Sequence, residues 1–230
     1  LPKPRGGLLF ENFQSTTSKY RIPITKIVLE DLYLRPLIKG KEIQKFHYNV
    51  SEWVVPFPYD DKHTRVPISL NELRRQSPKL ASYLYKHKTT IDAQTNYNER
   101  IIGNKENREF YALARVGDYS MGDVFVAFRD NSKWGACVIG FVPTPWGRIA
   151  RPCFQNHAVS ISQYGDGRFI SEEEAHYLCG ILNAPIVDSY IRSSSDSRSF
   201  KVRPPVFIPE FDSNNIHHTE IAKLSRKAHS

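Results

Sequence analysis

Between residues 110 and 161 the chain consists of short apolar runs with a period of two, and this feature constrains the fold most strongly. The runs are separated by glycine, proline or charged residues. They cover residues 111–116, 124–128, 136–141 and 158–161. Runs of this length between turn residues are typical of β-strands. We therefore expect a β region here, built as a curved or twisted sheet.

Helix start signals lie on both sides of this β region. Two capping boxes occur, in which a serine and a glutamate three residues later satisfy the first amides of a helix. They are Ser69 with Glu72 and Ser171 with Glu174. Ser77 followed by Pro78 predicts a further start, because proline is favoured at the first helical position. The expected fold class is therefore α+β, with a mixed or antiparallel curved β region and peripheral helices.

The end of the chain predicts three more elements. The tripeptide Asn183-Ala-Pro185 should interrupt the helix that begins after Ser171, and residues 186–191 should resume it. Residues 206–209 predict a short strand. An amphipathic helix is expected from about His218 to the end.

The balance of charge favours a polyanionic partner. The 230 residues contain 32 lysines and arginines against 24 aspartates and glutamates, a net charge of +8 with a pI near 9.3. Such a charge favours nucleic acid over acidic or neutral partners. Many basic proteins bind no nucleic acid, so the charge alone does not establish the partner.

Residues 33–46 concentrate this charge around Gly40. The apolar residues expected to face a core are Leu32, Leu34, Leu37 and Ile38. The cations expected to stay solvated and to point at an anionic partner are Arg35, Lys39, Lys41 and Lys45. We interpret the stretch as a strand followed by a basic turn, and its partner as nucleic acid.

Several chemistries have no motif in this chain. The three cysteines lie far apart without metal-ligand spacing, so we expect buried thiols in a reducing compartment and no metal site. No apolar run approaches the length of a membrane span, which favours a cytoplasmic protein. The chain lacks a glycine-rich phosphate loop and a G-x-S-x-G elbow. It also lacks the Asn-Pro-Pro-Tyr or Asp-Pro-Pro-Tyr tetrapeptide of amino-methylating enzymes, so we expect no methyl transfer within it.

One pattern leaves a nuclease open. Asp60-Asp61-Lys62 has the D-x-K spacing of a metal-dependent nuclease, which would need a partner acid such as Glu42 or Glu52. Such triplets also arise in solvated charged loops, the interpretation that we favour. A stand-alone nuclease and an RNA-binding or protein-interaction module remain the alternatives.

The composition suggests one main domain after a connector. Residues 1–23 have the composition of a connector or a loosely held terminus, and residues 24–230 form the expected domain, with possible lobes at 24–105 and 106–230. The chain begins with Leu1 and its only methionine is Met121, so we expect it to be part of a longer protein.

Three stretches, in this order, carry a resemblance to a known family. The first is L-R-P-L-I-K-G-K-E-I-Q-K-F at 34–46, followed by W-V-V-P-F-P-Y at 53–59. The second is R-E-F-Y at 108–111 with Ala114-Arg115. The third is E-A-H-Y-L-C-G-I-L-N-A-P at 174–185, followed by Ile208-Pro209 and residues 218–229. Together they resemble the C-terminal target-recognition (specificity) domain of TaqI-type DNA adenine methyltransferases and of the fused type II restriction-modification enzymes that share it.

The resemblance implies a role in phage defence. It implies a domain that binds duplex DNA, recognises a short sequence and presents an adenine to a methyltransferase domain upstream in the same parent chain. That domain would use S-adenosylmethionine, so this segment itself is expected to hold no cofactor and to catalyse nothing.

The residue types in this chain suggest which side chains would contact DNA. Lysine and arginine on loops suit phosphates, whereas arginine suits guanine in the major groove. Our candidates for the DNA backbone are Lys39, Lys41, Lys45 and Arg35. Our candidates for base recognition are Lys133, Arg148, Arg151, Arg192, Arg198, Lys201 and Arg203.

Overall fold

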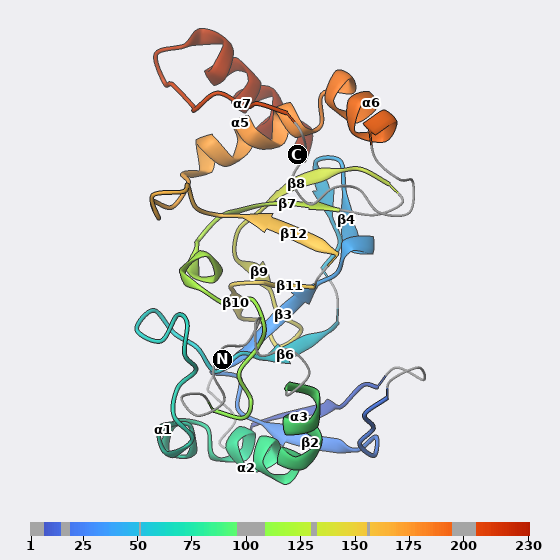
Figure 1. Ribbon diagram of the computed structural model, residues 1–230, viewed down its shortest axis with the longest axis vertical. Coiled ribbons are helices and arrows are strands. Elements are labelled where there is room, and N and C mark those ends of the chain that lie inside the picture. Colours follow the sequence, from blue (N-terminus) through green and yellow to red (C-terminus); the bar gives the residue numbers. More distant parts are fainter. Residues whose placement is uncertain are drawn as a thin grey trace. The chain divides into compact units, whose positions relative to one another are not determined.

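The computed structural model describes residues 7–14, 19–50, 52–95, 109–129, 133–155, 157–194 and 206–230 (Figure 1). Within these residues the fold is α+β, with six α-helices and several small sheets, none of them closed. The chain forms two compact units. The first comprises Leu1–Leu34 and Pro56–Met121, and the second comprises Arg35–Val55 and Gly122–Ser230. None of the helices in the described ranges is both long enough and apolar enough to cross a membrane.

Among the residues that the structure describes, the first unit contains a two-stranded antiparallel sheet and three short α-helices. Ser69 begins the first helix as predicted, because its side chain accepts a hydrogen bond from the Glu72 amide at 3.3 Å. The second helix gains a cap from outside, since the Glu30 carboxylate accepts from the Lys79 and Leu80 amides at 3.0 Å each. The elements are β1 (Leu8–Glu11), β2 (Lys26–Leu29), α1 (Leu70–Gln76), α2 (Pro78–Lys86), α3 (Lys88–Thr95) and the 3-10 helix η3 (Asp118–Met121).

The strand expected at residues 111–116 is not present. Tyr111 is buried, but its hydroxyl donates to the Ile68 carbonyl at 2.6 Å, and the Leu113 amide donates to the Tyr59 hydroxyl at 2.7 Å. Hydrogen bonds that involve tyrosine hydroxyls therefore replace some of the backbone hydrogen bonds that a neighbouring strand would form. The strand prediction was wrong because a buried turn produced the same apolar pattern.

The second unit contains the larger group of strands. The runs predicted at 124–128, 136–141 and 158–161 correspond to β7 (Phe125–Arg129), β8 (Ala136–Ile139) and β12 (Ala158–Ile161), which form an antiparallel sheet in the order β12-β7-β8. A second sheet has the order β11-β3-β6, with β11 parallel to β3. The remaining elements are β3 (Leu34–Ile38), the 3-10 helix η1 (Gly40–Glu42), β4 (Ile43–Gln44), β5 (His47–Tyr48), β6 (Val54–Pro56), β9 (Val142–Pro143), β10 (Ile149–Ala150) and β11 (Cys153–Phe154).

Strand β7 is buried on both faces, which explains its continuous apolar sequence. Val126 and Phe128 join a core cluster with α5 (Glu172–Leu182) and α6 (Pro185–Ser194). Ala127 belongs to a second cluster that includes Ile38. Helix α5 lies on β7 and β8 and packs against α7 (Ile216–His229), as Figure 1 shows.

The second capping box is confirmed at the start of α5. The Ser171 hydroxyl accepts from the Glu174 amide, and the Glu174 carboxylate accepts from the Ser171 amide at 2.6 Å. Tyr164 and Arg168 also donate to this carboxylate. Burial would raise the pKa of Glu174, but these hydrogen bonds outweigh it and lower the pKa to about 2.

The end of the chain differs in part from expectation. Residues 206–209 form no strand, although Ile208 packs on the core of the second unit and the Pro209 carbonyl accepts from the Tyr177 hydroxyl at 3.2 Å. The terminal helix begins at Ile216, with Asn215 as its N-cap. The expected terminal helix is therefore confirmed, with its start two residues earlier.

Candidate nucleic-acid interface

The basic stretch at 33–46 forms β3 followed by the short turn of η1 and β4. Leu34 and Ile38 are buried as expected, whereas Leu32 is 52% exposed because it lies in the turn before β3. Gly40 is required by close approach of the backbone, since a Cβ there would lie 2.4 Å from the His157 carbonyl oxygen. The Glu42 carboxylate is buried and accepts from the Lys39 amide at 2.8 Å.

The four cations expected to contact the DNA backbone have different surroundings. Arg35 and Lys39 are half-buried, and Lys39 Nζ lies 4.0 Å from the centre of the Trp53 ring. Burial lowers the pKa of Lys39. Lys41 is exposed on η1. Lys45 is also exposed, so the side chains of Lys41 and Lys45 are more accessible to solvent than those of Arg35 and Lys39.

Lys45 and Arg192 share one carboxylate. Lys45 Nζ lies 2.9 Å from Oδ2 of Asp188, and Arg192 Nε lies 2.5 Å from Oδ1 of the same residue. The side chain of Asp188 is 16% exposed, whereas Lys45 and Arg192 are 41% and 49% exposed. We call these three residues the shared-carboxylate cluster. It brings together one residue expected to contact the backbone and one expected to recognise bases.

The protonation state of Asp188 follows from these contacts. Burial would raise its pKa, but the hydrogen bonds from Lys45 and Arg192 outweigh burial and lower the pKa. The carboxylate is therefore ionised at neutral pH, and the cluster carries a net charge of about +1 with two cations and one anion. Both cations keep N–H groups beyond those given to Asp188, because lysine has three donors and arginine has five.

Both sides of the cluster are attached to Ala136, the first residue of β8. The Ala136 carbonyl accepts from the Phe46 amide at 2.8 Å, which positions the residue that follows Lys45. The buried Asn183 side chain donates to the same carbonyl at 2.7 Å and accepts from the Ala136 amide at 2.9 Å. Asn183 lies between α5 and α6, so these bonds position the helix that carries Asp188 and Arg192.

The two residues before Ala136 also hold these segments close to β8. The Trp134 side chain is buried and donates through Nε1 to the Leu182 carbonyl at 2.7 Å. Gly135 permits the approach of the basic turn, because a Cβ there would lie 2.9 Å from the Lys45 amide nitrogen. The cluster is thus supported by backbone and buried side chains on either side.

The other described candidates for base recognition lie on separate elements. Lys133 is exposed immediately before Trp134. Arg148 is exposed in the turn between β9 and β10, where its amide donates to the Thr144 hydroxyl at 3.0 Å. Arg151 forms an ion pair with Asp123 at 2.9 Å, which uses part of its hydrogen-bonding capacity. The candidates Arg198, Lys201 and Arg203 lie outside the described residues.

The nuclease-like triplet forms a compact turn in the first unit. Asp60 accepts from the Lys62 amide at 2.9 Å and from the His63 amide at 2.8 Å, and it lies 2.8 Å from Nδ1 of His63. Burial would raise the pKa of Asp60, but these bonds lower it. Among the residues that the structure describes, no group of three or more His, Cys, Asp or Glu side chains is arranged to hold a metal ion.

The three thiols are free, and two of them are buried. Burial raises the pKa of all three, to about 12 for Cys179 and about 11 for Cys153. These thiols are therefore protonated at neutral pH and are poor nucleophiles.

Sequence reasoning missed Asp188 and Asn183 as parts of the candidate site. Asp188 was not singled out in the sequence, and the signal that could have found it is its spacing of four from Arg192, which favours an ion pair on a helix. Asn183 was expected only to interrupt a helix. Its role depends on Ala136, which is 47 residues away in the sequence.

Neither a comparison with protein-family models nor a comparison with curated proteins finds a match to this chain.

Proposed function

We propose that this chain recognises a short sequence in duplex DNA, as the specificity domain of a larger adenine methyltransferase or restriction-modification enzyme. Catalysis would take place outside it, in an upstream domain that uses S-adenosylmethionine. The finer architecture that we propose is that of a TaqI-type specificity domain. The three sequence stretches that resemble that family and the α+β fold support this proposal.

The observation that carries the proposal is the shared-carboxylate cluster. Lys45 and Arg192 are 147 residues apart in the sequence, yet both donate to Asp188. A solvated lysine suits a phosphate, and an arginine held in one orientation suits a guanine edge or a phosphate. Base recognition requires such orientation, because a flexible arginine cannot present its two donors in a fixed geometry.

The positions of the charges support different roles for the candidate residues, with some contacting phosphates and others contacting bases. Lys41 and Lys45 would neutralise phosphates and position the duplex, since phosphate contacts carry most of the affinity and no sequence information. Arg192, Arg148 and Lys133 would contact base edges. Arg151 would first have to give up part of its ion pair with Asp123.

Binding of labelled duplex DNA by the 230-residue chain tests this proposal. We expect the affinity to fall steeply with salt, with a slope of about −0.9 in log–log form for each phosphate contacted. An RNA duplex of matched length should compete poorly. Fluorescence anisotropy at four or five salt concentrations measures both quantities.

Three results would contradict the proposal. Equal competition by RNA would favour a general RNA-binding module. Magnesium-dependent cleavage that is lost in Asp61→Ala would favour the stand-alone nuclease. Methyl transfer to DNA by this chain alone, in the presence of S-adenosylmethionine, would place catalysis where we propose none.

A further inference from the structure

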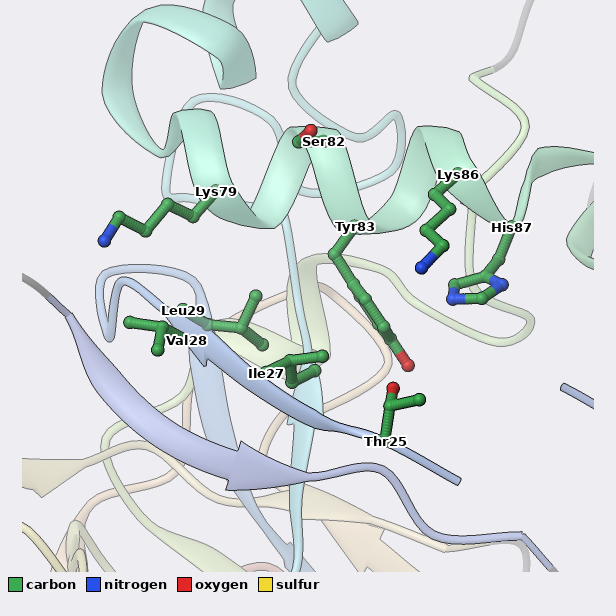
Figure 2. Close-up of a pocket in the computed structure, with 9 residues that line it drawn as sticks. All are labelled: Thr25, Ile27, Val28, Leu29, Lys79, Ser82, Tyr83, Lys86 and His87. Carbon is green, nitrogen blue, oxygen red and sulfur yellow. The ribbon is translucent and has the colours of Figure 1, made fainter. Parts of the chain in front are cut away.

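A groove of about 330 Å³ lies between β2 and α2 within the first unit (Figure 2). Its floor is apolar, with Ile27 and Leu29 on the more buried face of β2. Hydroxyl groups and two lysines surround that floor. The full lining is Thr25, Ile27, Val28, Leu29, Lys79, Ser82, Tyr83, Lys86 and His87.

Helix α2 presents two different faces. Leu80 and Leu84 are buried on one face. Lys79, Tyr83 and Lys86 follow one another at spacings of four and three, so they lie along the other face, toward β2. Figure 2 shows Lys79 and Lys86 at opposite ends of the groove, with Tyr83 between them. A stripe at this spacing usually packs on the core, but here its two ends are cationic.

The charge in the groove is positive. None of the described residues that line it is acidic. Glu30 follows β2 directly and caps α2, where its carboxylate accepts from the Lys79 and Leu80 amides at 3.0 Å each, so it is not part of the lining. Burial, and then the charge of Lys86, lowers the pKa of His87, so His87 is neutral at neutral pH. The lysines therefore supply the net charge.

The spacing of the lysines favours a repeated anion over a single small one. Seven residues along a helix correspond to about 10.5 Å. In the groove, two cations are separated by hydroxyl groups and an apolar floor. This arrangement suits a polymer that has one negative charge per unit and less polar groups between the charges. Nucleic acid has this pattern, because its phosphates alternate with sugars.

We propose that this groove binds the sugar–phosphate backbone of the DNA, with Lys79 and Lys86 each neutralising a phosphate. The inference rests on the proposed function, which it extends to a second contact surface. Ser82 and Tyr83 would donate hydrogen bonds to phosphate oxygens, and Ile27 would contact a sugar.

The test is duplex binding by the double variant Lys79→Ala/Lys86→Ala in the 230-residue chain. We expect the affinity to fall at least about tenfold and the salt slope to become shallower by about 1.8, or 0.9 for each lost contact. Lys79→Arg/Lys86→Arg keeps both charges and should bind within about threefold of the unmodified chain.

The matched control is Lys26→Ala/Lys62→Ala, which also removes two charges from the first unit. Lys26 neighbours Thr25 and Ile27 on β2, so its side chain points to the opposite face, and Lys62 lies in an exposed turn. An equal loss in control and groove variants would overturn the inference. The inference would also be overturned if the salt slope of the groove variant were unchanged while Lys41→Ala/Lys45→Ala weakened duplex binding. That result would not contradict the proposed function. A chain that binds no duplex in unmodified form would overturn both.

Discussion

Replacing Asn183 with alanine will lower the free energy of unfolding by about 3 kcal/mol, because it removes two buried hydrogen bonds and takes from the Ala136 amide its bond to Asn183, while the Ala136 carbonyl keeps its bond from the Phe46 amide. Asn183 is 4% exposed. Its side-chain nitrogen donates to the Ala136 carbonyl at 2.7 Å, and its side-chain oxygen accepts from the Ala136 amide at 2.9 Å. Alanine can replace neither bond, and water has little access to a buried position. Urea denaturation followed by circular dichroism measures the loss.

The control for this prediction is Asn214→Ala in the same unit. Asn214 is exposed before α7, so its replacement should change the free energy of unfolding by less than about 0.5 kcal/mol. Equal stability of the two variants would show that the bonds to Ala136 do not fix the junction of α5 and α6. The support that we assign to the shared-carboxylate cluster would then be incorrect.

Replacing both Lys45 and Arg192 with alanine will weaken duplex binding by about 100-fold. Each of the two substitutions removes a charge-assisted contact with DNA, and such a contact contributes about tenfold in affinity. The salt slope should also become shallower by about 1.8 if both cations contact phosphates, and by about 0.9 if Arg192 contacts a base. Anisotropy titrations of the same duplex measure affinity and slope together, so they also distinguish these two roles.

The control here is Lys223→Ala/Lys227→Ala, which removes two exposed charges from α7 in the same unit. We expect a loss of less than about threefold, because general electrostatic attraction is screened over about 10 Å at ordinary salt. Equal losses in the two double variants would indicate attraction by net charge alone. They would remove the cluster from the interface.

Local signals in the sequence predicted much of the secondary structure. Ser69 and Ser171 mark helix starts because capping depends on residues within one turn. The runs at β7, β8 and β12 were predictable as strands because each is a short apolar run between turn residues. The strand prediction for residues 111–116 was wrong because a buried turn has the same apolar composition as a strand.

Contacts between distant residues were not predictable from the sequence. Lys45 and Asp188 are 143 residues apart, and nothing local to either one indicates the other. The parallel pairing of β3 with β11 likewise joins Leu37 to Cys153, and it places residues 35–55 in the unit formed by the C-terminal part of the chain. Such pairings depend on the whole fold, whereas patterns of charge and hydropathy describe only neighbours.

Selection from a pool of duplexes with a randomised centre tests sequence recognition most directly. The 230-residue chain is mixed with the pool at about 0.15 M salt, bound duplexes are recovered over several rounds, and their sequences are compared with those recovered by Lys45→Ala/Arg192→Ala. We predict that the unmodified chain enriches one short sequence containing an adenine, and that the variant loses or relaxes this preference. Recovery of all sequences in equal proportion by the unmodified chain would contradict sequence-specific recognition.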